Sequence, residues 1–158
     1  MGIIYPMPPK NFYSRLVYLR QKPLIGALAY ALLKLLGVEI PRSVPIGDDL
    51  ELAHGAVGSV VHSRARLGAR IKLYPGVTLG RADVYRAAAR SRFEGIVIED
   101  DVVLGAGCKV LCSEGVLHVR HGTVIGANAV LLESTGEWEI WAGIPARCVG
   151  KRDPQDLP

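Results

Sequence analysis

The chain has 158 residues, 49% hydrophobic and 22% charged, a composition that excludes a globally disordered protein and suits one domain with a continuous core. Its 19 Lys and Arg against 15 Asp and Glu give a net charge of +4, which is compatible with small anionic ligands but too small to indicate nucleic-acid binding. The cysteines, Cys108, Cys112 and Cys148, are odd in number and lack metal-ligand spacing, so we expect free thiols in a reducing, cytoplasmic setting.

The first segment, residues 1–37, is predicted to be helical from residue 11 onward, with Pro23 separating a short helix from a second one rich in Leu, Ala and Ile. Its apolar run, residues 24–36, is shorter than the about 20 residues that span a bilayer, and no signal-peptide pattern is present. Two interpretations stay open. The helices cover the first coil or a neighbouring subunit, or they contact a membrane surface peripherally, helped by Lys10, Arg15, Arg20, Lys22 and Lys34.

In three runs between Val61 and Leu131 an aliphatic residue recurs every six positions, a period of neither a helix nor a strand. Such hexads are typical of a parallel β-helix, in which each hexad forms one flat side of a coil and three make a turn. Strands of a β-sandwich would instead alternate between turns about 8–12 residues apart. The repeated positions are Val61, Leu67, Leu73, Leu79, Ile98, Leu104, Val110, Val119, Ile125 and Leu131.

Two further positions of the hexad are also selective. Small or apolar residues follow four places later, at Ala65, Ile71, Val77, Val102, Cys108, Thr123 and Ala129. Glycine directly follows several aliphatic positions, at Gly47, Gly68, Gly80, Gly105 and Gly126. We expect these glycines to mark corners, where the backbone adopts conformations closed to other residues.

Among the four histidines, His54 is the strongest candidate for a general base, because Gly55 after it lets a ligand approach and Glu39 upstream is available to orient its ring. A zinc site built from histidines is the alternative. His118 and His121 are three residues apart and His62 lies elsewhere, and this spacing does not set three imidazoles around an open fourth position.

Several motifs in fixed order resemble the serine acetyltransferase branch of the left-handed β-helix, hexapeptide-repeat acyltransferases. They are Val-Glu-Ile at 38–40, Leu-Ala-His-Gly at 52–55, Gly-Val-Thr-Leu-Gly at 76–80, Leu-Gly-Ala-Gly-Cys-Lys-Val-Leu at 104–111, Ile-Gly-Ala-Asn-Ala at 125–129 and Ala-Gly-Ile-Pro-Ala-Arg-Cys-Val-Gly-Lys at 142–151. The resemblance implies a left-handed parallel β-helix over residues 38–151, a short tail at 152–158, and a homotrimer with active sites between subunits.

The resemblance also implies an acetyl-CoA-dependent O-acetyltransferase that needs no metal. His54 then takes the acceptor's proton and Glu39 orients it, although the family has aspartate at the Glu39 position and a second aspartate where this chain has Ala53. Acetyl-CoA is expected to lie along Gly105, Ala106, Gly126 and Ala127, with Arg147 and Lys151 near the nucleotide phosphates.

An insertion, residues 81–95, interrupts the hexads and is predicted to form a loop that binds the acceptor through Arg81, Tyr85, Arg86, Arg90 and Arg92. Serine acetyltransferases carry a glycine-rich loop with a second histidine here, which this chain lacks. Serine acetyltransferases also have a longer helical region than this chain, and residues 153–158 lack the isoleucine-ended tail of those enzymes. We therefore expect O-acetylation of a sugar or polysaccharide precursor first, serine O-acetylation second, and a non-catalytic or metal-binding β-helix third.

Overall fold

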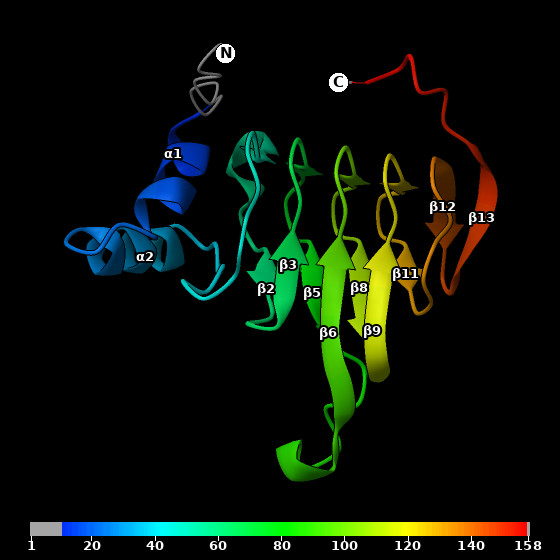
Figure 1. Ribbon diagram of the computed structural model, residues 1–158, viewed down its shortest axis with the longest axis horizontal. Coiled ribbons are helices and arrows are strands. Elements are labelled where there is room, and N and C mark those ends of the chain that lie inside the picture. Colours follow the sequence, from blue (N-terminus) through cyan, green and yellow to red (C-terminus); the bar gives the residue numbers. More distant parts are fainter. Residues whose placement is uncertain (1–10, 158) are drawn as a thin grey trace, which may run out of the picture.

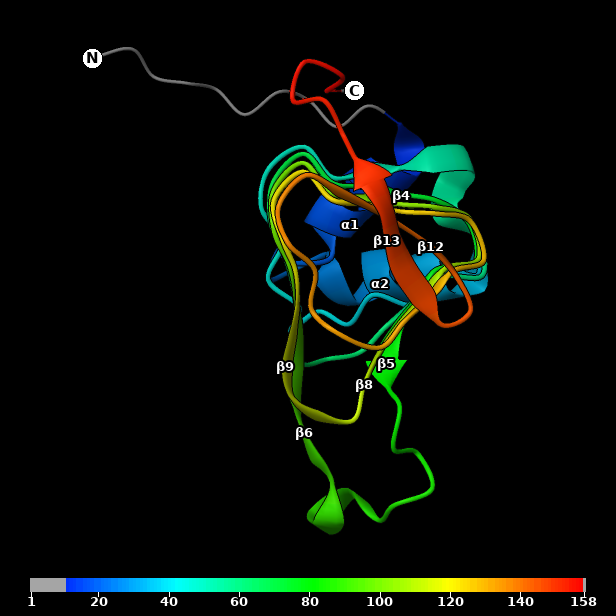
Figure 2. The ribbon, with the colours of Figure 1, turned by 90° about the vertical axis from the view of Figure 1, so that its right-hand side faces the viewer.

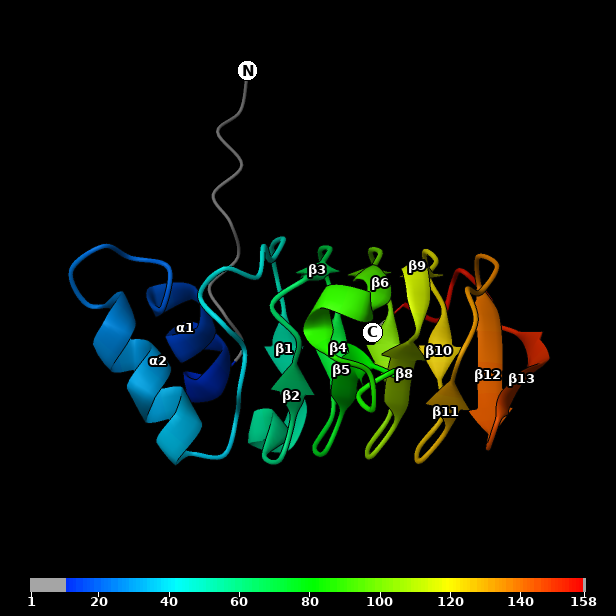
Figure 3. The same ribbon diagram turned by 90° about the horizontal axis from the view of Figure 1, so that it is seen from below.

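Successive strands of the chain fall into three sheets that surround one core and are parallel except for the last strand, in a computed structural model that describes residues 11–157 (Figures 1, 2 and 3). Sheet 1 holds β1 (Glu51–Leu52), β4 (Lys72–Leu73), β7 (Val103–Leu104), β10 (Val124–Ile125), β12 (Glu139–Gly143) and β13 (Ala146–Lys151). Sheet 2 holds β2 (Val60–Val61), β5 (Thr78–Arg81), β8 (Lys109–Cys112) and β11 (Val130–Leu131). Sheet 3 holds β3 (Ala65–Leu67), β6 (Arg92–Ile98) and β9 (Glu114–Val119).

The hexad positions stack on one another from coil to coil, which confirms the predicted β-helix. In sheet 2, for example, Val61 pairs with Leu79 and Leu79 with Val110. These aliphatic side chains are at most 4% exposed, and the small residues four places later are buried with them. Each fully buried aliphatic side chain contributes about 1.5–3 kcal/mol, so the stacked core accounts for the stability of short strands.

None of the five recurrent glycines has the positive φ expected of a corner, and three of them are explained by close approach, whereas a Cβ at Gly80 would have only ordinary contacts. Gly47, Gly68 and Gly105 do not have positive φ. Instead, a Cβ at Gly47 would lie 2.7 Å from the backbone of Gly68, and one at Gly105 would lie 2.7 Å from the carbonyl oxygen of Ile125. Glycine is required there because adjacent coils touch. The left-handed corner positions belong to other residues, among them Gly58, Gly76, Gly107 and Asn128.

The connections between sheets form three edges of a triangular prism, visible end-on in Figure 2. The segments 53–59, 74–77, 105–108 and 126–129 join sheet 1 to sheet 2, and we call them the His54 edge. The segments 62–64, 82–91 and residue 113 join sheet 2 to sheet 3, and we call them the loop edge. The segments 68–71, 99–102 and 120–123 return from sheet 3 to sheet 1.

Two helices, α1 (Phe12–Leu19) and α2 (Gly26–Leu35), cover the first coil, as the sequence predicts (Figure 3). Leu16, Val17, Ala29 and Leu33 pack into the common core. Arg20 is buried and donates to the carbonyl oxygen of Val44 at 3.0 Å, so the expectation that it helps a membrane contact is wrong. Burial lowers the pKa of Arg20 to about 10. Lys10 and Pro158, which the sequence analysis also used, lie outside the described residues.

The last coil is closed by a hairpin. Strand β12 pairs with β10 in parallel and with β13 in antiparallel fashion, so β13 turns back over the end of sheet 1. Trp141 and Ala146 of this hairpin are buried in the core, and Trp141 extends the inward stack of Leu104 and Ile125. Both ends of the ladder are therefore covered.

Candidate active site

His54 lies at the start of the His54 edge, in a short turn, η1 (Ala53–Ala56), with its side chain exposed. Its backbone is left-handed, with φ 50° and ψ 30°, and positive φ continues through Gly55 and Ala56. Left-handed backbone disfavours residues other than glycine by about 1–2 kcal/mol each. Strain of this kind concentrates at functional sites, which makes this turn the first candidate for chemistry.

Helix α1 holds that turn from behind. The Asn11 side-chain amide donates to the carbonyl oxygen of Leu52 at 2.9 Å, and the Leu52 N–H donates to the Ser14 hydroxyl at 3.0 Å. The ring of Tyr13 packs against Gly55, where a Cβ would lie 2.8 Å from two ring carbons. Sequence reasoning missed these contacts, because no local pattern links residues 41 and 38 positions apart.

Tyr74 is the neighbour of the His54 ring, with ring centroids 6.1 Å apart and planes inclined by 49°. Leu52 pairs with Leu73 in sheet 1, so the residues that follow each of them meet on the same edge. This register was the signal that could have identified Tyr74. The tyrosine gives His54 an aromatic wall on the side of the second coil.

Glu39 lies on the strand-like segment before the His54 turn and forms a parallel bridge with Val60. Its carboxylate accepts from the Lys34 ammonium at 3.3 Å, and both side chains are about half exposed (49% and 42%). Within residues 11–157 the partner recorded for this carboxylate is therefore Lys34. The role assigned to Glu39 as the orienting acid stays a prediction.

The four small residues expected to border acetyl-CoA lie on the same edge as His54. Gly105 and Ala106 follow β7, two coils beyond the His54 turn, and Gly126 and Ala127 follow β10, one coil beyond Gly105. Ala106 and Ala127 are exposed, and the Asn128 N–H donates to the Ala106 carbonyl oxygen at 2.8 Å, which stacks the two turns. The structure thus brings His54 and these residues onto one edge that bulky side chains do not cover there.

Arg147 and Lys151 lie on β13, beyond the last of these turns. The Arg147 guanidinium pairs with Glu133 at 3.1 Å, and the Lys151 ammonium pairs with Glu139 at 3.0 Å. Both cations are about two-thirds exposed, so such surface pairs are weak and exchange partners easily. To contact the nucleotide phosphates as predicted, each cation would have to leave its carboxylate partner for a phosphate.

The insertion lies on the loop edge, not on the His54 edge. It projects away from the prism between β5 and β6 and carries a short helical turn, η2 (Ala88–Arg90) (Figures 1 and 2). Tyr85, Arg86, Ala87 and Arg90 line a hollow of about 340 Å³ there, with the Arg86 guanidinium 5.6 Å from the centre of the Tyr85 ring.

Not all the predicted acceptor residues of this insertion are available. Arg81 braces the base of the loop, with Nε 2.9 Å from Oδ1 of buried Asp83. Burial would raise the pKa of Asp83, but hydrogen bonds from Arg81 and Ser91 outweigh it and lower the pKa. Arg92 pairs with Glu114 at 2.9 Å on the surface. Tyr85, Arg86 and Arg90 are the members that gather around one hollow.

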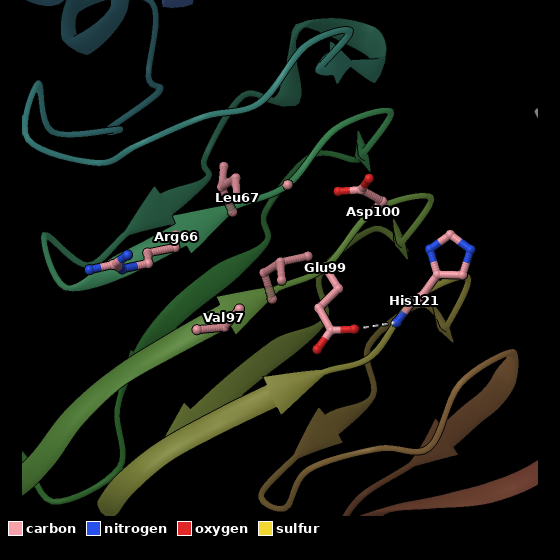
Figure 4. A pocket seen from close by; sticks show the side chains of 8 residues that line it. Arg66, Leu67, Val97, Glu99, Asp100 and His121 are labelled. Carbon is pink, nitrogen blue, oxygen red and sulfur yellow. Dashed lines mark hydrogen bonds between the residues drawn. The ribbon is translucent and has the colours of Figure 1, made fainter.

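A second hollow, of about 450 Å³, lies on the far side of the prism from the His54 edge, over β3 and β6 (Figure 4). None of the predicted site residues lines it. It is bordered by Arg66, Leu67, Gly68, Val97, Ile98, Glu99, Asp100 and His121, and the backbone N–H of His121 donates to the Glu99 carboxylate at 3.0 Å.

The histidines are spread around the prism. His62 lies on the loop edge, His118 on β9 and His121 on the edge that returns to sheet 1. Within the described part of the chain, no three His, Cys, Asp or Glu side chains gather as a metal ion would require. Burial, with help from Arg64 and Arg81, lowers the pKa of His62, whose ring packs edge-on against Phe93.

Comparisons with known proteins point to one group. The chain is 34% identical to a serine acetyltransferase of Staphylococcus xylosus over 130 residues, which are 77% of this chain and 56% of that protein. It superposes on serine acetyltransferase of Vibrio cholerae with a TM-score of 0.70 and 29% identity, covering 92% of this chain and 54% of that one. The enzyme of Brucella abortus strain S19, solved in complex with coenzyme A, gives a TM-score of 0.65 and 26% identity, covering 89% and 54%.

Two facts bound this likeness. The chain spans about half the length of the curated relatives it matches, from 56% down to 48%. A search against protein-family models finds no match.

Proposed function

We propose that this chain, which belongs to the serine acetyltransferase-like branch of the hexapeptide-repeat β-helix acyltransferases, transfers the acetyl group of acetyl-CoA to the hydroxyl of a small acceptor. The observation that carries the proposal is the His54 edge. An exposed histidine in a strained turn lies on the same edge as the exposed Ala106 and Ala127 of later turns. The relative solved with coenzyme A supports acetyl-CoA as the donor.

The chemistry needs one base and a clear path. His54 accepts the proton of the acceptor hydroxyl while that oxygen attacks the thioester carbonyl. A carbon–oxygen bond forms and, as the tetrahedral intermediate collapses, the carbon–sulfur bond breaks and the sulfur takes the proton from His54. A backbone N–H donor at the edge stabilises the oxyanion. Ala106 and Ala127 leave room for the extended pantetheine arm beside the coil backbone.

A complete site requires a second copy of the chain. Sheet 2 separates the His54 edge from the loop edge, so one chain holds its catalytic histidine and its insertion at different corners. A closed trimer in which the loop of one copy reaches the His54 edge of the next satisfies both. Sedimentation equilibrium at micromolar concentration tests this; a monomer there refutes it.

The acceptor favoured by the relatives is serine, because the similar proteins reported above carry that name. The exposed Arg86 and Arg90 suit the carboxylate of an amino acid. This ordering reverses the expectation from sequence, which put a sugar first. A sugar stays the second candidate because Tyr85 offers a flat, exposed face beside those arginines.

The test is release of free thiol from acetyl-CoA with L-serine beside a panel of sugars. His54→Ala should lower turnover roughly 10²–10⁴-fold with CoA affinity retained, the size typical of general-base catalysis. His62→Ala is the matched control on the other edge and should keep turnover. If His62→Ala is inactive and His54→Ala is not, the site is misplaced. Glu39→Gln should have a smaller effect than His54→Ala, because Glu39 acts only by orienting the ring.

Loop variants separate the two acceptors. Arg86→Gln should raise the Michaelis constant for serine, since it removes a partner of the carboxylate. Tyr85→Ala should affect a sugar more than serine, since it removes a stacking surface. If no thiol is released with either serine or a sugar, the non-catalytic alternative remains.

A further inference from the structure

The outward face of α2 and the turn before it expose large apolar side chains. Leu24 is 95% exposed, Leu35 82% and Leu28 74%, while Ala29 and Leu33 on the opposite face are buried. Leu28 and Leu35 are seven positions apart, so they point the same way from the helix. A helix that is apolar on both faces is normally covered on both, and a cluster of exposed leucines marks a surface with a partner.

The helical segment that carries this face has charges of one sign. Residues 11–38 include Arg15, Arg20, Lys22 and Lys34 and no Asp or Glu. Arg20 is buried and Lys34 pairs with Glu39 at 3.3 Å, so the cations left for a partner are Arg15 and Lys22, and Lys22 lies next to the leucine-bearing turn. Two copies that meet through this face in a two-fold contact would bring like charges together, which is unfavourable. An anionic surface complements it.

The location also fits a flat partner. The helical hairpin forms one end of the molecule, beyond the first coil, and the C-terminal hairpin of β12 and β13 is at the other end (Figures 1 and 3). In the described part of the chain, no helix has the length and apolar character needed to cross a bilayer. Apolar contact without crossing is the behaviour of a helix that lies in the membrane interface.

We propose that the α2 face, defined by Leu24, Ile25, Leu28 and Leu35, binds the surface of an anionic lipid bilayer. The leucines insert at the boundary between headgroups and acyl chains, and Lys22 contacts lipid phosphates. This proposal stands apart from the proposed acetyl transfer, because its residues are not those of the His54 edge or the loop.

The experiment is co-sedimentation of the full chain with vesicles. Phosphatidylcholine vesicles with about 30% phosphatidylglycerol are compared with pure phosphatidylcholine, at about 0.1 M and 0.5 M salt. We expect binding to the anionic vesicles that weakens at high salt, and little binding to the neutral ones. The variant Leu24→Ser/Leu28→Ser/Leu35→Ser should bind about tenfold or more weakly. Lys22→Gln should weaken binding and reduce its salt dependence.

The matched control is Leu132→Ser, which removes a leucine that is 53% exposed at the other end of the coil, and it should bind as the unchanged chain does. Circular dichroism and sedimentation velocity verify that each variant is folded and report its mass. Unchanged binding by the triple variant, equal binding to neutral vesicles, or no binding by the unchanged chain would each overturn the proposal. If the triple variant also has a smaller mass than the unchanged chain while neither binds vesicles, the face joins copies of the chain instead.

Discussion

Replacing Gly55 with alanine should destabilise the chain through two separable effects. Gly55 has φ +75°, a conformation that disfavours a side chain by about 1–2 kcal/mol. A new Cβ would also lie 2.8 Å from two carbons of the Tyr13 ring, and relieving such overpacking in a packed region takes about 1–3 kcal/mol. We expect the free energy of unfolding of Gly55→Ala to fall by about 2–5 kcal/mol, the sum of the two ranges.

Gly115→Ala is the matched control for the first effect. Gly115 has φ +64°, and a Cβ there meets nothing within 4 Å, so only the backbone contribution of about 1–2 kcal/mol applies. Urea unfolding followed by circular dichroism measures both variants. In a Tyr13→Ala background the penalty of Gly55→Ala should shrink to that of Gly115→Ala. The reasoning fails if Gly55→Ala is no more destabilising than Gly115→Ala in the unchanged background.

Three other predictions address the edge that returns from sheet 3 to sheet 1, the insertion and the core. The Arg70 guanidinium, 2.7 Å from both oxygens of Asp101, holds the pKa of that carboxyl below its ordinary value against the effect of burial. A lowered carboxyl pKa stabilises the fold above about pH 4, and this contribution is lost as the pH falls through the lowered value. Arg70→Met should therefore reduce the unfolding free energy by its full amount at pH 7 and by less in acid, as measured by urea unfolding at each pH. A difference that does not change with pH contradicts this. Replacing residues 84–90, the exposed part of the insertion, by a glycine linker should raise the acceptor's Michaelis constant and leave CoA binding in calorimetry unchanged. Unchanged acceptor kinetics would show that the loop arginines are only solvated surface. Ser59→Ala should reduce the unfolding free energy by about 1–3 kcal/mol, because the buried Ser59 hydroxyl donates to the Tyr74 carbonyl oxygen and accepts from the Val77 N–H, both at 3.2 Å. The control Ser63→Ala, at an exposed position, should be neutral, and equal effects of the two variants would contradict the prediction.

The core was the part of the fold that sequence could predict. Hexads specify which side chain points inward, and residues such as Leu79 and Val110 stack as that rule requires. The glycines show its limit, because an aligned glycine looks the same in sequence whether it serves positive φ or close approach. Only the distance of 2.7 Å from a Gly105 Cβ to the next coil separates the two.

The candidate site was predictable in its parts and not in its arrangement. The Leu-Ala-His-Gly motif located His54, and the small residues after β7 and β10 were found on the same edge. The long-range contacts of Asn11 and Ser14 with Leu52 could not be predicted, because the fold of the helical segment brings these residues together. The burial of Arg20 could not be predicted for the same reason, since its partner Val44 lies 24 residues away in the sequence.

The loop edge has a consequence for how this architecture diversifies. Its connections differ in length, from residue 113 alone, through 62–64, to 82–91. The strands on either side still pair with the next coil, and a register shift between Phe93 and Gly95 in β6 is the irregularity next to the longest connection. Changes of length at this corner therefore leave the buried stack unaltered, so selection can exchange loops there without having to re-evolve the scaffold. Under the proposed function, a foreign insertion grafted between β5 and β6 should change the acceptor while the His54 edge stays as it is.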